Sequence, residues 1–555
     1  MSLRPAPVPS VPEETARVAH AAFPHGHPHL RMRDEFPRFF EDEQFRALFA
    51  HRGRPADAPW RLALVSVLQY AEGLSDRQAA DAVRRCLDWK YLLGLELTDP
   101  GFDFTLLCDF RDRLLAGSAE LLLFETLLTC FRERKLLHAR GPQRTDATHV
   151  LAAIRLLNRL ESVGETLRHT LNILATVAPD WLRAHCRPEW VERYEQRFEE
   201  ERLPESARER DALAATIGAD GVALLTALYG PTGPEWLRQV PAVAVLRQVW
   251  VQQYYREETA GGCRLRWRTE NELPPAPQRI ISPYDPEARF GQKRRVAWGG
   301  YKVHFTETCE PDLPVLITDV QTTPPLTGDH ETVPAIHAAL AARDLLPAAH
   351  LVDGGYVEAG VLVSSQEDHQ VDLVGPPRED TTWQAREGTG FTAREFQIRW
   401  EEQVAVCPQG EKSSAWAEKQ ERGKPVIQVS FALTTCRGCP SRERCTRAVN
   451  AGRKLTLHPE KEDRALQAAR ARRATPEFAE SYKVRAGIEG THAQGVRRCG
   501  LRRCRYVGAR KVHLQHLLTA AALNFVRVAA WLMDAKRSRT RVSAFTRLMA
   551  PAAAG

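Results

Sequence analysis

Residues 482–511, YKVRAGIEGTHAQGVRRCGLRRCRYVGARK, are the stretch around which the rest of the chain is interpreted. Tyr482, Arg485 and Glu489 are spaced i, i+3 and i+7, so a helix would place their side chains on one face. Glu489 is either a solvated partner of Arg485 or a metal ligand beside a DNA backbone. The charged residues that follow it are all basic: Arg497, Arg498, Arg502, Arg503, Arg505, Arg510 and Lys511.

The charge of the chain is concentrated at its C-terminal end. Residues 482–541 contain 14 Lys/Arg and 2 Asp/Glu, a balance of +12, which leaves −5 for the remainder of a chain whose net charge is +7. A basic end on a mildly acidic body is typical of a protein that binds a polyanion. A basic tail that only aids solubility is the alternative, but much of this charge lies in a segment that also looks folded.

Length and composition predict a large soluble protein with two to four domains. A hydrophobic content of 43% is enough for substantial cores. No run of about 18 apolar residues occurs, so we expect no membrane span. Residues 1–29 lack the apolar core of a signal peptide, and their prolines indicate a flexible leader.

Residues 30–130 are predicted to be helical throughout. Residues 60–70, WRLALVSVLQY, are apolar on a helical period, and Gly73 should end this helix. Ser75 can cap the next helix, with Gln78 placed to complete a capping box. Two helices joined by so short a turn are compatible with a helix-turn-helix, and plain helical packing is the alternative.

The other two acids that stand out are expected on strands. Asp146 lies in a segment rich in Thr, Val and Ala, where a buried carboxylate must be paired or metal-bound. Residues 155–260 then return to helix, and residues 262–290 should form an irregular linker. For Asp146, an exposed place on an edge strand or in a turn is the alternative.

Strand signals return after the linker, and they lead to Asp353. Residues 297–308 and 313–322 read as strands, and Asp329 is expected to cap a helix that runs to Asp344. The short strand 350–353 ends on Asp353, and open α/β sheets place functional residues just beyond the carboxyl ends of strands. An Asp353-Gly354 turn is the alternative.

Three carboxylates in this setting suit the cleavage and transfer of phosphodiesters. In that chemistry, two Mg²⁺ ions about 3.5–4 Å apart contact the attacking and leaving oxygens. Such hard cations take oxygen ligands, which Asp146, Asp353, Glu489 and the scissile phosphate would supply.

Four stretches carry a resemblance to a known family: residues 68–114 (LQYAEGLSDRQAADAVRRCLDWKYLLGLELTDPGFDFTLLCDFRDRL), 145–155 (TDATHVLAAIR), 351–360 (LVDGGYVEAG) and 482–494 (YKVRAGIEGTHAQ). In this order they resemble the insertion-sequence DDE transposases of bacteria that have a Tyr-Arg-Glu signature near the C-terminus. The resemblance implies an α/β fold with an α-rich N-terminus. The core would be RNase H-like, a mixed five-stranded sheet flanked by helices, interrupted by a helical insertion and by a β/loop insertion.

The resemblance also implies roles for individual residues. Asp146, Asp353 and Glu489 match the ligands of two Mg²⁺ (or Mn²⁺) ions, and Tyr482 and Arg485 match residues that contact DNA phosphate. An Arg suits that contact because its planar fork grips phosphate through two hydrogen bonds. The family has a Lys seven residues after the Glu, where this chain has Val496 followed by Arg497. The predicted DNA-binding set is Tyr482, Arg485, Arg497, Arg498, Arg502, Arg503 and Arg505.

A cysteine cluster lies in the expected β/loop insertion. Cys407, Cys436, Cys439 and Cys445 include a Cys-x2-Cys pair, which is typical of a structural Zn²⁺ site with four thiolates. Reduced buried thiols or an iron–sulfur cluster are the alternatives. Most of the other cysteines are scattered, which suits reduced thiols in a cytosolic protein.

The predicted activity is DNA transposition. The enzyme would bind the terminal inverted repeats of its element as a homodimer on double-stranded DNA, cut them by hydrolysis and join each 3′-OH to target DNA. We expect it in the bacterial cytoplasm at the nucleoid, without a membrane. A metal-dependent nuclease or resolvase on the same fold, or a decayed protein that only binds DNA ends, are the alternatives.

The expected domains follow the same signals. They are a flexible leader (1–29), a helical DNA-binding domain (30–135), the first part of the core (136–160), the helical insertion (161–285), the continued core (286–375), the β/loop insertion (376–475), the C-terminal catalytic helices (476–535) and a basic flexible tail (536–555).

Overall fold

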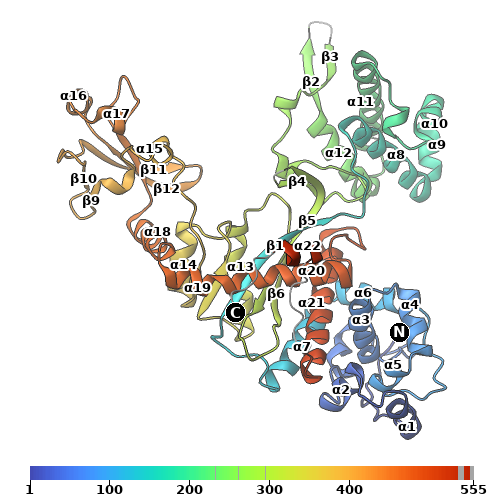
Figure 1. Cartoon of the computed structure of the whole chain (residues 1–555). Helices are drawn as coiled ribbons and strands as arrows, with labels where there is room; N and C mark the ends of the chain where they lie inside the picture. Colours follow the sequence, from blue (N-terminus) through green and yellow to red (C-terminus); the bar gives the residue numbers. More distant parts are fainter. Residues whose placement is uncertain (232, 260–261, 294, 536–542, 550–555) are drawn as a thin grey trace. The chain divides into compact units, whose positions relative to one another are not determined.

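The computed structural model describes residues 1–555 apart from residues 232, 260–261, 294, 536–542 and 550–555 (Figure 1). The basic stretch 536–541 therefore lies outside the described residues. The chain divides into two compact units. The first comprises Met1–Leu136, Pro311–Leu316 and Ala521–Gly555, and the second comprises Leu137–Glu310 and Ile317–Ala520.

Before residue 137 the first unit is helical, as its sequence predicts. The helix α3 forms its centre, because 12 of its 14 residues are buried. The elements of this part are α1 (Glu13–Ala22), α2 (Pro28–Glu35), the 3-10 helix η1 (Asp42–Leu48), α3 (Pro59–Glu72), α4 (Asp76–Arg85), α5 (Leu87–Leu92), α6 (Thr105–Ala116) and α7 (Leu122–Glu133).

The turn between α3 and α4 has the predicted chemistry. Gly73 ends α3 with a φ of 69°, a left-handed conformation that glycine adopts without steric cost. Ser75 caps α4 and forms the expected capping box with Gln78. Asp76 at the start of α4 pairs with Arg111 of α6 at 2.5 Å, so the helix pair is fixed to its neighbour.

The expected flexible leader is folded in part. Residues 13–22 form α1, and Ala19 of this helix packs in a cluster with Leu30 and Tyr91. The hydroxyl of Thr15 donates to the Leu95 carbonyl at 2.8 Å. The prolines of residues 1–29 indicate a flexible segment. The structure differs because α1 has an apolar side that packs on its neighbours.

The second unit is built on a six-stranded mixed sheet. The strand order is β4-β5-β1-β7-β8, and β6 also pairs with β5. Strand β1 runs antiparallel to β5 and parallel to β7, so the sheet is the mixed one that the sequence predicts. Its strands are β1 (Gln143–Leu151), β4 (Arg289–Lys293), β5 (Val296–Thr308), β6 (Ile317–Thr323), β7 (Ala349–Val352) and β8 (Asp372–Val374).

Five of these strands make an RNase H-like core, in the order β6-β5-β1-β7-β8. The sixth, β4, pairs with the first residues of the long strand β5, and β6 pairs with its later residues. Helices α20 (Gly487–Cys499) and α21 (Ala509–Leu532) contact one face, through the Phe305–His492 stack and through Thr322. Helix α13 (Val333–Ala342) contacts the other face through its His337.

A buried ion pair joins the sheet to the segment that precedes α20. Arg144 of β1 and Glu307 of β5 lie 2.6 Å apart, and the Glu307 side chain is fully buried. The hydroxyl of Thr491 donates to the second oxygen of Glu307 at 2.5 Å. Arg144 also donates to the Val484 carbonyl at 2.5 Å, which fixes the backbone one residue before Arg485.

The helical insertion follows β1 and has its own core, which includes Trp190, Ile217, Leu246 and Trp250. Helix α11 is long and apolar enough to cross a membrane by length and composition, but several of its side chains pack in this core. The elements are α8 (Arg159–Val177), α9 (Pro179–His185), α10 (Pro188–Tyr194), α11 (Ala207–Tyr229), α12 (Pro241–Gln253), β2 (Tyr254–Thr259) and β3 (Gly262–Trp267).

Two predictions about the segments around β3 and α13 are wrong. The linker expected at 262–290 begins with β3, because β2 and β3 form a hairpin in which Tyr254 packs against Trp267. Asp329 does not cap the helix that follows it. Its carboxylate accepts from the Lys302 ammonium at 2.5 Å, and residues Asp329–Thr332 form a 3-10 turn (η6) before α13.

The second insertion consists of short strands and loops on a small apolar core that includes Phe396, Val429, Phe431 and Leu455. This agrees with the β/loop insertion predicted for residues 376–475. The elements are α15 (Trp383–Glu387), β9 (Gln397–Arg399), β10 (Val404–Val406), β11 (Ala415–Glu421), β12 (Lys424–Ser430), α16 (Leu433–Arg437), α17 (Arg442–Cys445) and β13 (Lys454–Leu457).

Candidate active site

The sheet places two of the three predicted acids side by side in the fold. Asp146 lies on β1, and Asp353 directly follows β7, which is the parallel neighbour of β1. Glu489 is the third residue of α20, the helix that stacks on the face of β5. The predicted positions of all three acids on these elements are confirmed.

Arg485 brings the three acids into one group. Its guanidinium lies 2.9 Å from Asp146 Oδ2, 3.9 Å from Asp353 Oδ2 and 3.5 Å from Glu489 Oε1. The side chain of Arg485 is 13% exposed, and the exposed fraction rises from 15% at Asp146 through 34% at Asp353 to 69% at Glu489. The group therefore opens toward solvent on the Glu489 side.

Burial and charge act in opposite directions on Asp146. Burial raises the pKa of its carboxyl, and the positive charge of Arg485 opposes that rise. The negative charge of Asp353 adds to the rise in pKa. A second cation near Asp146 would therefore stabilise the carboxylate form.

We predicted that Tyr482, Arg485 and Glu489 share one face of a single helix, and this prediction is wrong. Tyr482 ends α19 (Pro476–Tyr482), Arg485 lies in the 3-10 helix η8 (Lys483–Ala486), and Glu489 lies in α20. The break coincides with Gly487, where an added Cβ would lie 2.2 Å from Arg144 Nη1. The close approach of Arg144 requires a residue without a side chain here.

Tyr482 is engaged in a backbone contact. Its hydroxyl donates to the Val352 carbonyl at 2.9 Å, and its ring stacks on Phe478. Burial raises the pKa of this hydroxyl to about 12. Tyr482 thereby fixes the end of β7 next to Asp353, and its phenol is neutral at ordinary pH.

His492 supports the site, and it is not among the residues predicted from the sequence. Its ring stacks on Phe305, and Nε2 donates to the Asp146 carbonyl at 3.2 Å. Burial lowers the pKa of His492 to about 4, so the imidazole is neutral at ordinary pH. Its position one helical turn after Glu489 is the only sequence signal for this role.

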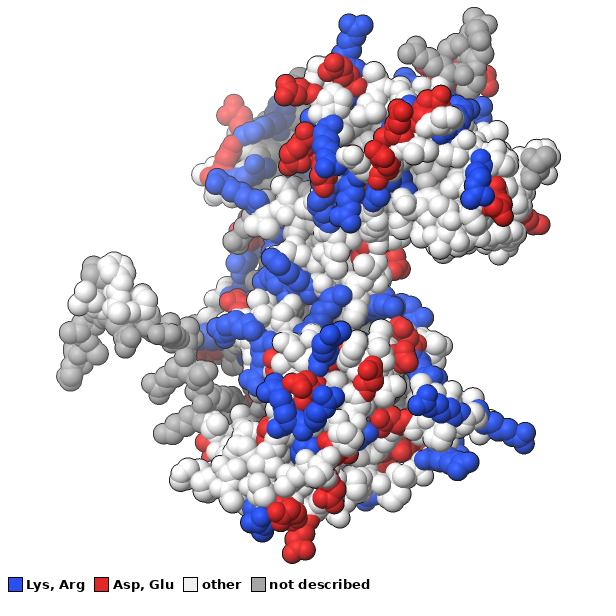
Figure 2. Space-filling model, turned by 90° about the vertical axis from the view of Figure 1, so that its right-hand side faces the viewer, with Lys and Arg blue, Asp and Glu red and all other residues white. Residues whose placement is uncertain are grey.

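The predicted DNA-binding arginines divide into two kinds. Arg497, Arg498 and Arg503 are exposed, whereas Arg502 and Arg505 are half-buried. Arg502 lies 2.8 Å from a ring nitrogen of His149 and donates to the His149 carbonyl, so it also holds its segment against β1. Figure 2 shows one face of the molecule, where Lys and Arg predominate over Asp and Glu in the middle of the view.

The four cysteines of the second insertion line one small cavity of about 30 Å³, together with Phe391, Phe396 and Phe431. Burial raises the pKa of the Cys445 thiol, and the charges of the other three cysteines add to the rise. The positive charge of Arg453 opposes the rise in pKa. Metals bind the thiolate form of cysteine, so a cation among the four sulfurs would offset both the burial and their mutual repulsion. The four thiols come from the end of β10, from α16 and α17, and from the turn between these two helices.

Two family models match parts of the chain. The model described as "Transposase DDE domain" matches residues 406–529, and the model described as "Transposase domain (DUF772)" matches residues 17–113. Glu489 and the four cysteines lie within the first range, whereas Asp146 and Asp353 lie outside both. Comparison with the curated proteins and with the solved structures gives no match.

Proposed function

The chain belongs to the insertion-sequence DDE transposases, and from this premise we propose that it cuts the ends of its element and joins them to target DNA. The observation that supports this activity most is the convergence of Asp146, Asp353 and Glu489 on the guanidinium of Arg485. Three carboxylates from separate elements on one buried cation form a site that is built for positive charge.

We propose that Asp146, Asp353 and Glu489 are the ligands of divalent cations, which this family generally uses. The donor set fits two Mg²⁺ or Mn²⁺ ions, because all three side chains offer oxygen ligands. Burial raises the pKa of Asp146, the most buried of the three, and a bound cation would favour its ionised form. Bound divalent ions would polarise the scissile phosphate and lower the pKa of the attacking water.

The basic residues around the acids are proposed to position the DNA. Arg485 can present two N–H groups to a phosphate oxygen pair, because its guanidinium lies at the centre of the group. Exposed Arg497, beside Val496, is the candidate for the contact that the family's Lys makes. Arg498, Arg502, Arg503 and Arg505 would contact the backbone further along, with Arg502 also serving the fold.

No protein nucleophile is required in this scheme. A water oxygen attacks the phosphorus at the element end, and the P–O bond to the 3′ oxygen breaks to leave a 3′-OH. That 3′-OH then attacks a target phosphate, with the target's own 3′ oxygen leaving. Tyr482 is unsuited to attack a phosphate, because its hydroxyl donates a hydrogen bond to the Val352 carbonyl and has a pKa of about 12.

The deciding experiment is a cleavage and joining assay with a labelled duplex of the element's flanking end and a plasmid target. Joined product that needs Mg²⁺, is lost with EDTA and is lost in Glu489→Gln supports the transposase. Glu480→Gln is the matched control, because this exposed glutamate pairs with the exposed Lys483 and lies outside the group of acids. It should join as the wild type does.

The other outcomes separate the alternatives. Nicks without joints would favour a metal-dependent nuclease or resolvase. End binding with neither nicks nor joints would favour a protein that has kept only its DNA-binding function. Joining by the Glu489→Gln variant would remove Glu489 from the site. Mass measurements of the complex with paired ends would test the proposed homodimer.

A further inference from the structure

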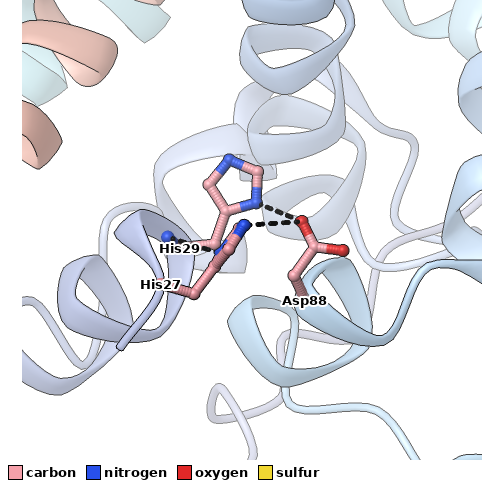
Figure 3. A group of neighbouring side chains, drawn as sticks. All are labelled: His27, His29 and Asp88. Carbon is pink, nitrogen blue, oxygen red and sulfur yellow. Dashed lines mark hydrogen bonds and ion pairs between the residues drawn. The ribbon is translucent and has the colours of Figure 1, made fainter. Parts of the chain in front are cut away.

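Two imidazoles and a carboxylate converge in the first unit, on residues that the proposed transposition does not use. His27 is the N-cap of α2, His29 lies in the first turn of the same helix, and Asp88 lies in the first turn of α5. Figure 3 shows both rings directed at the same oxygen of Asp88. His29 Nδ1 lies 2.7 Å and His27 Nε2 4.0 Å from that oxygen.

These distances resemble those between ligands of one metal ion. Tetrahedral Zn²⁺ with bonds of about 2.0–2.1 Å places its ligand atoms about 3.4 Å apart, and the two observed distances lie on either side of that value. The three donor atoms all lie within 4.8 Å of one another. In the described part of the chain, no other three His, Cys, Asp or Glu side chains form so tight a group.

The surroundings restrict water and hold the rings in place. The side chains are 27%, 12% and 19% exposed for His27, His29 and Asp88. The ring of Phe23 lies 4.6 Å from that of His27, and the ring of Phe525 lies 6.0 Å from that of His29. The nearby charge of Glu72 acts on His27 and would help to balance a divalent cation.

The chain is also enriched in imidazoles at this place. Residues 20–29 contain four of the eighteen histidines, at positions 20, 25, 27 and 29. Without an ion, a single carboxylate would serve both imidazoles at the centre of this group. An ion pair between His29 and Asp88 accounts for the position of the His29 ring. It does not account for the His27 ring, whose Nε2 lies 4.0 Å from the same oxygen.

We propose that His27, His29 and Asp88 bind a borderline divalent cation of the Zn²⁺ class, with water completing the coordination. Two imidazoles and one carboxylate are a donor set that such ions take in proteins. The ion would join the cap of α2 to the first turn of α5 and so fix the N-terminal helices of the first unit. Its role is structural, and the site is separate from the four cysteines.

Two existing hydrogen bonds would be lost when an ion binds. The first joins His29 Nδ1 to Asp88 Oδ2 at 2.7 Å, and the ion would lie between these two atoms and bind both. The second lies at the N-terminal cap of α2. The backbone N–H of His29 donates to His27 Nδ1 at 3.3 Å, which places the proton of the neutral ring on Nε2. An ion on Nε2 would move that proton to Nδ1, and the bond would be lost. At 3.3 Å this is a weak hydrogen bond, and the coordination of a metal ion replaces it with a much stronger interaction.

Zinc content of the full chain, purified without chelator, tests the site. In a Cys436→Ser/Cys439→Ser background, which removes the cysteine cluster as a ligand set, we expect about one zinc per chain. His27→Gln/His29→Gln in the same background should lower this to background level. His25→Gln is the matched control, because His25 is exposed and lies outside the group. It should retain the zinc.

A second measurement covers the case in which the double histidine variant fails to fold. Co²⁺ added to the cysteine-depleted chain should give weak visible bands without the strong near-ultraviolet band of a thiolate ligand, and Zn²⁺ should abolish them. Zn²⁺ should also raise the melting temperature of that chain. The proposal is overturned if the cysteine-depleted chain holds no zinc and shows neither response, because His29 and Asp88 then form only an ion pair.

Discussion

The acids of the core and the cysteines of the second insertion are two sets of candidate ligands that the chain assembles in opposite ways. Asp146 and Asp353 are far apart in sequence and come together because β1 and β7 are parallel neighbours. The four cysteines lie within residues 407–445 and meet through short turns around one cavity. The first group rests on a buried sheet, and the second rests on a small core of its own.

This difference concerns what holds each group in place. The acids already have an internal cation in Arg485, and the pair of Arg144 with Glu307 fixes the backbone next to it. In the cysteine cluster, short helices and loops carry the thiols, so a metal would contribute much of the order. We therefore expect the core to tolerate loss of its ligands and the insertion to depend on them.

The largest effect is expected from Asp353→Asn, which removes a negative charge and leaves the shape unchanged. Cleavage of the element end should fall about 10⁴-fold, because an amide cannot balance a divalent ion. The melting temperature should stay unchanged, since Asp353 is partly exposed at the end of a strand. Asp368→Asn on the exposed side of α14 (Ala359–His369) is the control. A large drop in melting temperature would contradict the idea that the core tolerates loss of its ligands.

Glu307→Gln should have the largest effect on stability. It leaves Arg144 buried without its charge partner, which typically costs about 3–5 kcal/mol. Urea unfolding monitored on the second unit measures this change. Cleavage should fall as well, because Arg144 holds the Val484 carbonyl beside Arg485. A change below about 1 kcal/mol would mean that the sheet fixes this segment without the ion pair.

Cys436→Ser tests the dependence of the insertion on its ligands. We expect the loss of about one zinc per chain and proteolysis about 100-fold faster within residues 376–475, because an unliganded cluster opens locally. The core should resist the protease as before. Cys108→Ser, at an exposed cysteine of α6, is the control. Unchanged zinc and unchanged proteolysis would show that the thiols are simply reduced.

Acid should weaken the sheet through His304 of β5. Burial lowers the pKa of this imidazole to about 3, with Lys302 lowering it further and Asp329 opposing the shift. The unfolded chain binds the proton first, near pH 6.5, so stability falls as the pH drops below that value and levels off near pH 3. At pH 5 the loss should be about 2 kcal/mol, measured by hydrogen exchange of the β5 amides. His304→Gln should make the slope shallower by this amount, and the part that remains belongs to other buried imidazoles such as His492. An unchanged slope would show that His304 does not contribute.

The smallest effect concerns competition between Arg485 and the divalent ions. Arg485→Gln removes a positive charge that lies within 4 Å of all three acids. Without DNA, the affinity for Mn²⁺ should rise about tenfold, while cleavage of DNA should fall. Titration calorimetry measures the affinity, and Lys483→Gln is the exposed control. An unchanged or lower affinity would show that Arg485 and the ions occupy separate space.

Much of the candidate site could be predicted from local signals. A carboxylate inside a segment rich in Thr and Val, and another at the end of a short apolar strand before two glycines, identified the elements of Asp146 and Asp353. Pairs such as Arg144 with Glu307, or His29 with Asp88, carry no such signal, because their partners depend on which strands and helices are neighbours. The same holds for Gly487. A glycine is required at this position because the side chain of Arg144 lies so close to it, and local sequence does not show that contact.

The sequence by itself determined the order of the acids along the chain, the strands that carry Asp146 and lead to Asp353, the Ser75 cap of α4, the basic C-terminal region and the cysteine cluster. These features depend on spacing, propensity and capping, which act within a few residues. Only the tertiary structure decided that Arg485 lies among all three acids, that Tyr482 binds the end of β7, and that α2 and α5 bring His27 and His29 to Asp88. Such contacts follow from sheet register and helix packing, which join residues that no local pattern relates.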